Sequence, residues 1–320
     1  MKNGLKDLFK IKLTLKKEDF ANLFGIKENE LPSGCVDMIQ SFNFNYSVIE
    51  GSQRDKLLLN IFKRIDAGEF SLAGKEGLGR WEKGWGENLE ELRKNDYDVS
   101  QLVPKYIRSG QPVRLFQQYI QPEDEGFELN WYQIFRLWLF KTYLSDVGAI
   151  YEFGCGSGFN LVALAELFPE KQLFGMDWAK QSVEIVNDLA KSHGYKVKGK
   201  LFDFFNPDET FNILPNSAIL TIGALEQTGR DYDGFLQYLL AASPRLCIHV
   251  EPIVEWYDEN NLIDYVAIRF HKTRKYWEGF LDRLEALEAE GKVEILKARR
   301  AFFGSLYLEG YSQLIWRTCG

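Results

Sequence analysis

The sequence predicts an α/β fold in the C-terminal part of the chain, a mostly parallel sheet covered by helices, after a mainly helical N-terminal region. From residue 149 onward, short apolar segments typical of strands alternate with segments of helical periodicity. Upstream of residue 147, apolar residues recur at helical spacing, as in 55–65 and 130–144. Because strands separated by helices join through right-handed crossovers, the later segments should form a parallel sheet.

Seven strands are expected. They are 149–153, 172–176, 197–202, 217–222, 246–250, 293–299 and 312–317. The helices expected with them are 159–167, 181–191, 232–242 and 276–290. The last two strands are joined without a helix, which favours an antiparallel pair at the sheet edge. We therefore predict a helical cap over residues 1–147 and an α/β domain over 148–320, with the Gly- and Trp-rich stretch 77–86 as a loop.

Composition excludes several classes of protein. The 320 residues carry a net charge of −7, the wrong sign for a protein that neutralises nucleic-acid phosphates. The four cysteines are scattered and none forms a CxxC pair, which disfavours a zinc site and fits a reducing compartment. No apolar run is long enough for a membrane span, and residues 1–7 lack the apolar core of a leader peptide. The sequence thus predicts a cytoplasmic protein with no nucleic-acid, membrane or metal partner.

A glycine-rich loop follows the first strand of the α/β region. Gly154, Gly156 and Gly158 alternate directly after the strand and before a helix. Glycines allow a tight turn and a close approach of a ligand, and a helix N-terminus offers free N–H groups. Parallel sheets bind ligands at the carboxyl ends of their strands, so this loop marks a binding site.

The spacing of the glycines distinguishes between ligands. A dinucleotide-binding loop has the pattern G-x-G-x-x-G, and here its third glycine position is Phe159. The acid Glu152 at the loop entry would repel a pyrophosphate and attract an ammonium group. The pattern therefore favours S-adenosylmethionine, which carries an ammonium and a sulfonium, over a nicotinamide dinucleotide.

These residues resemble the first motif of the class I S-adenosylmethionine-dependent methyltransferases, and the resemblance extends from Ala149 to Gly320. It implies a Rossmann-like sheet of seven strands whose C-terminal strand is antiparallel. It also implies that Asp177 binds the ribose hydroxyls and that Asp203 faces the adenine amino group. Asp177 could instead cap the next helix, and Asp203 could instead form a turn. The further cofactor contacts implied by the resemblance are Trp178, Phe204 and Gly223, although Gly223 could simply be a tight turn.

The acceptor is expected to be a small molecule. The family's Asn/Asp-Pro-Pro-Tyr/Phe motif for planar amines does not follow the fourth strand, and no acidic cluster indicates a magnesium site. The sequence favours an oxygen acceptor, such as that of a sugar or another specialised metabolite, over nitrogen or carbon. The alternatives are a non-catalytic module that binds S-adenosylmethionine or a protein partner, and a nicotinamide-dependent oxidoreductase.

A hydroxyl acceptor needs a general base, and three residues are candidates. Glu251 ends the fifth strand, with His271 and Glu226 as alternatives. Glu251 could instead be a capping acid, and His271 a surface residue at the start of a helix. His249 is expected in the core. Aromatic residues of the N-terminal region are expected to cover the pocket: Trp81, Trp85, Tyr106, Trp131 and Tyr132.

Overall fold

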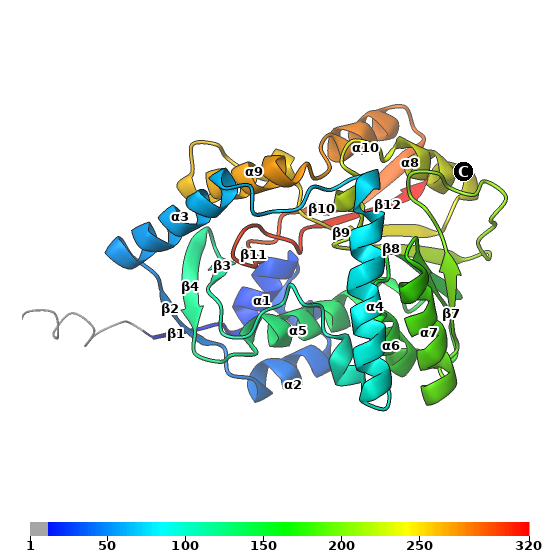
Figure 1. Cartoon of the computed structure of the whole chain (residues 1–320), viewed down its shortest axis with the longest axis horizontal. Coiled ribbons are helices and arrows are strands. Elements are labelled where there is room, and N and C mark those ends of the chain that lie inside the picture. Colours follow the sequence, from blue (N-terminus) through cyan, green and yellow to red (C-terminus); the bar gives the residue numbers. More distant parts are fainter. Residues whose placement is uncertain (1–11, 320) are drawn as a thin grey trace, which may run out of the picture.

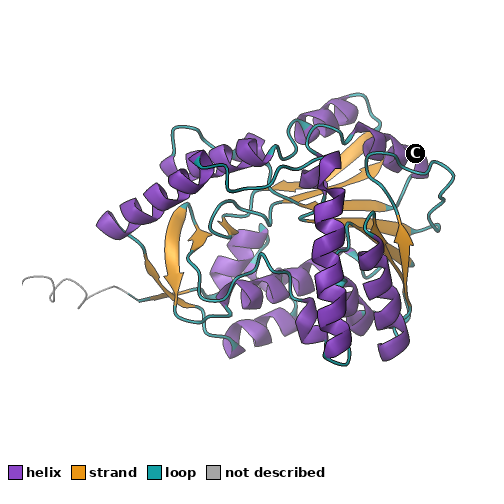
Figure 2. Ribbon diagram, in the orientation of Figure 1, coloured by secondary structure: helices purple, strands orange, loops and turns teal. Residues whose placement is uncertain are grey.

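The computed structural model describes residues 12–319. The prediction that residues 1–7 lack the apolar core of a leader peptide therefore lies outside the described residues. Figures 1 and 2 show two sheets, a larger one surrounded by helices and a smaller one beside it. No helix among residues 12–319 is long and apolar enough to cross a membrane.

The larger sheet confirms the predicted fold class. Its seven strands lie in the order β10-β12-β9-β8-β5-β6-β7. Strands β5 to β9 pair in parallel, and β12 is antiparallel to both β9 and β10. The bounds are β5 (Ala149–Phe153), β6 (Gln172–Asp177), β7 (Val197–Leu201), β8 (Ser217–Ile222), β9 (Leu246–Val250), β10 (Val293–Arg299) and β12 (Gln313–Thr318). The strand order reverses between β5 and β8, and ligands bind at such a reversal.

Helices cover both faces of this sheet. The helices of the α/β region are α6 (Phe159–Leu167), α7 (Lys180–His193), α8 (Asp233–Ala242), α9 (Leu262–Arg274) and α10 (Phe280–Ala289). Strand β5 is buried at every residue because its alternate side chains enter two different cores. Ile150 packs in the core with residues of α5 and α6, while Tyr151 and Phe153 pack in the core with α8 and α10. The sheet is therefore held rigidly beneath its ligand-binding edge.

Residues 12–147 contain five α-helices and four strands of a small sheet that sequence periodicity did not indicate. The helices are α1 (Lys17–Phe24), α2 (Ser33–Ser41), α3 (Gly51–Asp66), α4 (Leu78–Lys94) and α5 (Phe127–Tyr143). The sheet has the order β1-β2-β4-β3-β11. Its strands are β1 (Leu13–Thr14), β2 (Asn45–Val48), β3 (Val113–Leu115), β4 (Gln118–Pro122) and β11 (Phe303–Gly304). The short 3-10 helices are η1 (Glu28–Glu30), η2 (Lys75–Gly77), η3 (Val99–Leu102), η4 (Leu225–Thr228) and η5 (Val254–Trp256).

Strand β11 links the two parts of the chain. It belongs to the C-terminal half, yet Phe303 pairs with Leu115 of β3 in the small sheet. The N-terminal region thus completes its sheet with a strand contributed from more than 180 residues later in the sequence. The boundary predicted at residues 147 and 148 stays a prediction, and this strand crosses it.

Two predicted elements are wrong. The stretch 77–86 is not a loop but lies mostly in α4, which packs against α7 as Figure 1 shows. The helix expected over 276–290 begins only at Phe280, and α9 precedes it. His271 therefore lies inside α9 and is fully buried, rather than at the surface before a helix.

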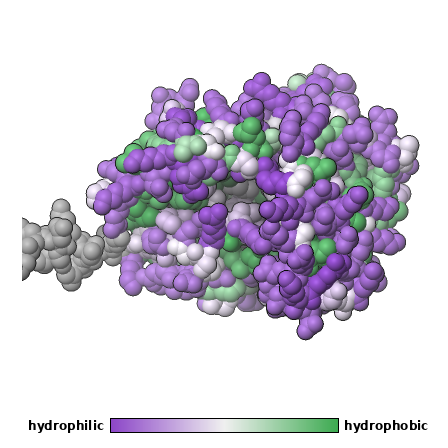
Figure 3. Space-filling view, viewed as in Figure 1, coloured by the Kyte–Doolittle hydropathy of each residue, from purple (hydrophilic) through white to green (hydrophobic). Residues whose placement is uncertain are grey.

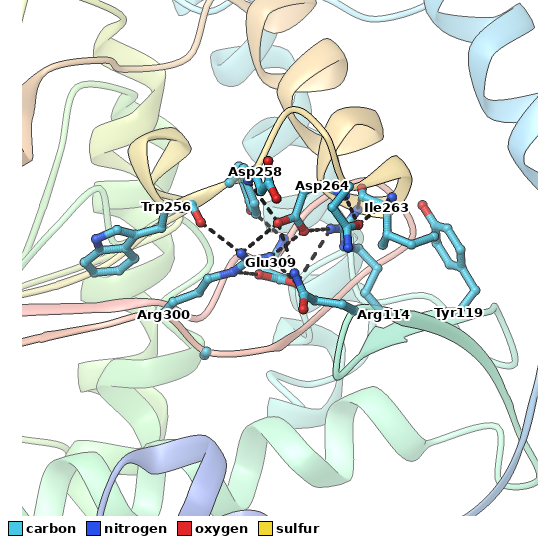
Figure 4. Close-up of polar contacts among 12 residues, drawn as sticks. Arg114, Tyr119, Trp256, Asp258, Ile263, Asp264, Arg300 and Glu309 are labelled. Atoms are coloured by element: carbon cyan, nitrogen blue, oxygen red, sulfur yellow. Dashed lines mark hydrogen bonds and ion pairs between the residues drawn. The ribbon is translucent and has the colours of Figure 1, made fainter.

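A buried group of four charges joins the small sheet to the C-terminal half (Figure 4). Arg300 bonds the carboxylate of Asp264 at 2.5 Å and that of Glu309 at 2.6 Å. Arg114 of β3 lies 3.5 Å from Asp264 and 3.6 Å from Glu309, and its guanidinium also donates to the carbonyl of Ile263 at 2.8 Å. The side chains of Arg114, Asp264 and Glu309 are wholly inaccessible to solvent. The two positive and two negative charges balance, as burial requires.

Candidate functional site

The glycine-rich loop lies at the carboxyl end of β5 and has the conformation that glycine favours. Gly154, Gly156 and Gly158 have φ angles of 72°, 51° and 75°. A Cβ atom on Gly154 would overlap the Cβ of Ala224, and one on Gly156 would lie 2.7 Å from the ring of Trp85. The first two positions therefore exclude a side chain by both backbone conformation and space.

Asp177, at the end of β6, is hydrogen-bonded to the backbone of this loop. Its carboxylate accepts hydrogen bonds from the N–H of Gly156 at 3.0 Å and of Ala179 at 2.9 Å. Burial raises the pKa of Asp177 to about 6, although the backbone hydrogen bonds from Ala179 and Gly156 act to lower it. The bond to Ala179 also supports the start of α7, which is the capping role considered as the alternative. A carboxylate has about four lone-pair positions, so these bonds leave room for a ligand.

Glu152 lies behind the loop and is 2% exposed. One carboxylate oxygen accepts a hydrogen bond from the Asn160 side chain at 2.8 Å, and Asn160 in turn accepts one from the Tyr132 hydroxyl at 2.6 Å. The other oxygen, Oε2, is buried and has no hydrogen-bond partner among residues 12–319. Burial raises the pKa of Glu152 to about 8, against the opposing effects of Asn160 and Arg136. A buried oxygen without a donor is costly unless a ligand supplies one.

A narrow pocket with a volume of about 70 Å³ opens beside the loop. It is smaller than typical small-molecule sites, which have roughly 300–1,000 Å³. Its walls are mostly aromatic or small, and the lining residues are Trp81, Trp85, Gly154, Asp177, Trp178, Phe204, Phe205, Gly223, Ala224, Gln227 and Thr228. The structure thus brings together five of the predicted cofactor contacts, namely Gly154, Asp177, Trp178, Phe204 and Gly223.

The other predicted cofactor residues stand apart from this lining. Gly156 lies beneath Trp85, and Gly158 packs near Leu189 of α7. Asp203 accepts a hydrogen bond from the N–H of Phe205 at 2.9 Å, which is the turn-forming role considered as the alternative. Glu152 lies behind the loop, as described above. Their cofactor roles stay predictions.

Helix α4 contributes two tryptophans to the pocket. Trp81 and Trp85 are four residues apart and stack with their ring centroids 5.9 Å apart and an interplanar angle of 17°. Trp85 lies directly on the glycine loop at Gly156. Trp131, expected beside them, is instead fully buried in the N-terminal core, where it stacks on Phe303. Phe205, Gln227 and Thr228 also line the pocket, and no sequence pattern indicated them.

Glu251 occupies a capping position. Its carboxylate is fully buried and accepts hydrogen bonds from the N–H groups of Ala224, Leu225 and Glu226, at 3.0–3.4 Å. Burial, followed by the charge of Glu226, raises the pKa of Glu251 well above its ordinary value. Both of its oxygens are engaged by the backbone after β8. Glu251 therefore shapes the segment around Gly223, and its predicted role as a base has no support from this position.

The histidines lie outside the pocket lining. His271 Nε2 is 2.6 Å from the carbonyl oxygen of Trp277, and burial lowers the pKa of His271 to about 4. His249 is in the core as predicted; its Nδ1 is 2.9 Å from the Thr221 hydroxyl, and burial lowers its pKa to about 3. His193 ends α7 and contacts the carbonyl of Tyr97. The pocket therefore has no imidazole in its walls.

A wider groove lies elsewhere, between η5, α9 and α10. Its lining includes Arg230, Glu255, Lys272, Glu278 and Asp282, so charges of both signs face open solvent. Small-molecule sites are instead mostly apolar with a few placed polar groups. The narrower pocket at the glycine loop fits that description, and the wide groove contains none of the predicted cofactor contacts.

No protein-family model matches the chain, and no curated protein matches it. Solved structures do match. An O-methyltransferase from neocarzinostatin biosynthesis, NcsB1, solved with S-adenosylmethionine and a naphthoic acid, is 14% identical, with a TM-score of 0.40 over 60% of this chain and 58% of that one. A SAM-dependent methyltransferase from Aquifex aeolicus is 15% identical, with a TM-score of 0.39 over 57% and 88%.

The small RNA methyltransferase HEN1 is 18% identical, with a TM-score of 0.41 over 59% of this chain and 25% of that one. These similarities are too low to assign an acceptor. The strand order, the antiparallel β12 and the loop after β5 are features of this chain itself. On these features the chain has the Rossmann-like fold of the class I methyltransferases.

Proposed function

We propose that the protein is a methyltransferase that uses S-adenosylmethionine and acts on a small-molecule acceptor. The pocket at the carboxyl ends of β5, β6 and β8 carries this proposal, because it combines a side-chain-free loop, a carboxylate and aromatic walls. Gly154 and Gly156 leave no room for a Cβ, and Asp177 lines the pocket. A non-catalytic binding module would use the same pocket, so turnover has to be measured separately.

The residues present fit this cofactor. The carboxylate of Asp177 can accept hydrogen bonds from ribose hydroxyls. Trp178, Phe204 and Phe205 offer aromatic faces for an adenine. The unpartnered oxygen of Glu152 suits an ammonium group, and the stacked indoles of Trp81 and Trp85 suit a nearby cationic centre.

When bound, the cofactor supplies a methyl group on a sulfonium, which is already a good leaving group. The protein then has to align donor and acceptor and exclude water, and alignment alone accounts for a large part of such rate enhancements. Helix α4 covers the glycine loop through Trp85. Gly223 and Ala224 line the pocket, and Glu251 holds the backbone of this segment through the N–H groups of Ala224, Leu225 and Glu226.

Calorimetry with S-adenosylmethionine, S-adenosylhomocysteine and NADH tests the cofactor assignment. We expect binding of the first two and none of NADH. Asp177→Asn should weaken binding by about tenfold, the value of about one lost charge-assisted hydrogen bond. Asp208→Asn is the matched control, because Asp208 is exposed and bonds only within its own turn to Thr210. A wild-type protein that binds neither sulfur compound refutes the proposed function.

Turnover decides between an enzyme and a binding module. The protein is incubated with methyl-labelled cofactor and a metabolite extract, and labelled product is separated from the cofactor. Labelled product that requires the intact pocket supports the enzyme. Cofactor binding without any labelled product favours the non-catalytic module.

A further inference from the structure

The pocket beside the glycine loop is closed by the protein itself. Its volume of about 70 Å³ is well below the roughly 300 Å³ at which sites that enclose small molecules begin. Two indoles take up the missing space. Trp85 lies so close to the loop that a Cβ on Gly156 would be 2.7 Å from its ring, and Trp81, stacked on Trp85, lines the same pocket. A ligand of the size of the cofactor can therefore enter only after these indoles have moved.

The two halves of α4 are held very differently. Leu89 and Leu92 are its buried residues, and both pack in a core with residues of α6 and α7. Arg93 adds ion pairs to two acids of α7. Residues 78–86, by contrast, include no buried residue. They are held by the two indoles and by Arg80, whose guanidinium donates to a backbone carbonyl of the preceding segment at 3.1 Å. The first half can thus move while the second half stays in place.

Three glycines weaken the first half of α4 without a packing reason. Gly79, Gly84 and Gly86 lie inside the helix, and none of them has a positive φ. An added Cβ would meet no atom within 4 Å at Gly79 or Gly84, and at Gly86 it would lie an ordinary 3.7 Å from the Gln181 side chain. Alanine would therefore fit at all three positions and would make the helix more stable. The glycines lower the stability of the very turns that carry the two indoles.

The outer side of α4 faces solvent. The helix crosses the front of the molecule in Figure 1, and Figure 3 shows that hydrophilic side chains cover most of this face. Lys83, Glu87 and Glu90 are exposed along the helix. An outward movement of its first half would therefore meet water rather than other parts of the protein.

We propose that residues 78–86 form a gate on the cofactor site, which Trp81 and Trp85 hold closed in this structure. The helix unwinds around Gly84, the indoles leave the surface of the glycine loop, and the cofactor binds beside Gly156 while the second half of α4 stays anchored. This rests on the proposed function and adds a conformational step before cofactor binding. Because the closed form excludes the ligand, the ligand binds only to the molecules whose gate is open.

Hydrogen exchange of the free protein measures the opening directly. The amides of residues 82–86 and of residues 89–93 all lie within α4, beyond its first turn, and they should exchange alike if the helix opens as one unit. We expect residues 82–86 to exchange at least about tenfold faster, because only the second half is packed in a core. Equal protection of the two halves overturns the gate.

Gly84→Ala should hold the gate closed more firmly without a new contact. Gly84 does not line the pocket, and an added Cβ there meets no atom within 4 Å. Exchange at residues 82–86 should slow about fivefold, the factor that corresponds to about 1 kcal/mol of helix propensity, while exchange at residues 89–93 stays unchanged. The control is Asn60→Ala, which also raises helix propensity at an exposed position, in α3, and should change neither.

Binding kinetics connect this opening to the cofactor site. The apparent association rate constant of S-adenosylhomocysteine is measured by stopped-flow tryptophan fluorescence. It should fall in Gly84→Ala by the same factor of about five, because fewer molecules are open when the ligand arrives. Asn60→Ala should bind at the rate of the wild type.

The possible results separate the gate from the proposed function. If exchange at residues 82–86 slows in Gly84→Ala but S-adenosylhomocysteine associates at the rate of the wild type, the gate is overturned while cofactor binding stands. If exchange does not slow in this variant, unwinding around Gly84 is overturned. Failure of S-adenosylhomocysteine to bind the wild type overturns the proposed function, and the gate with it.

Discussion

Neutralising Asp264 should destabilise the protein strongly, because this residue holds together the buried charge group. Its carboxylate accepts two bonds from Arg300, at 2.8 and 2.5 Å, and one from the Gln117 side chain at 3.2 Å. Arg114 lies 3.5 Å away. In Asp264→Asn, two guanidinium groups share the single carboxylate of Glu309, which leaves one net positive charge in a site closed to solvent.

Breaking a buried ion pair from one side costs about 3–5 kcal/mol in free energy of unfolding. An unfolding entropy of about 2.1 cal/mol/K per residue gives this chain about 0.7 kcal/mol/K, so the melting temperature should fall by about 4–7 °C. Urea unfolding followed by circular dichroism measures the free energy of unfolding, and a thermal scan measures the melting temperature. Coincidence of the fluorescence and circular dichroism transitions is measured first, because it tests whether unfolding is two-state.

The control is Glu278→Gln, which removes an ion pair to Arg230, whose own side chain is 81% exposed. Exposed pairs contribute at most about 1 kcal/mol, so this variant should unfold almost as the wild type does. An Asp264→Asn protein whose stability equals that of the control would show that the four charges add nothing beyond surface pairs, and the reasoning would be refuted.

Three further outcomes are expected. Trp85→Ala should let S-adenosylhomocysteine associate faster, as measured by stopped-flow fluorescence, because the indole covers Gly156; an unchanged rate contradicts a covering role. Burial raises the pKa of Glu128 from 4.5 to about 7, so its stabilising contribution is complete below pH 4.5 and is lost as the pH rises through 7. The loss is about 3 kcal/mol at most. Urea titrations across this range should slope downward, and Glu128→Gln should flatten them. A fragment of residues 148–319 should not fold alone, because β11 then lacks β3 and the buried carboxylates of Asp264 and Glu309 lack Arg114; a stable proteolytic fragment beginning near residue 146 would contradict this.

The sheet could be predicted because its strands are buried on both faces. Each central strand reads as a short apolar run bounded by helical segments, and β5 is buried at all five residues. The small sheet gave no such signal, since its strands have two to five residues and β11 has only two. Strands this short carry too few side chains to show a period of two.

Helix α4 was missed for a different reason. Gly79, Gly84 and Gly86 lower the intrinsic helix propensity of its first turns by about 1 kcal/mol each. Packing overrides this penalty, because Trp81 and Trp85 share one face of the helix with Leu89 and Leu92, which are buried. The tryptophan spacing of four residues was the available sign of a helix.

Some residues of the candidate site could be predicted from the sequence and others could not. Residues fixed by local chain geometry, such as Gly154 and Asp177, could be placed from their positions at strand ends. Glu251 and His271 could not, because their roles depend on which distant groups surround them: three backbone N–H groups in one case and the carbonyl of Trp277 in the other. Sequence position identifies an acid at a strand end but not whether its oxygens are already bonded.

The pairing of β11 with β3 can form only late in the synthesis of the chain, after β11 has been translated. Phe303 follows its partner Leu115 by 188 positions. At a translation rate of about 5–20 residues per second, β3 waits roughly 10–40 s for that strand to be made. Throughout that interval this edge of β3 has its backbone groups unpaired, and for most of it Arg114 lacks its acidic partners, since Asp264 follows it by 150 positions and Glu309 by 195. An unpaired strand edge is open to wrong pairing, and a charged side chain on the edge discourages it, so Arg114 protects β3 until the last strand arrives.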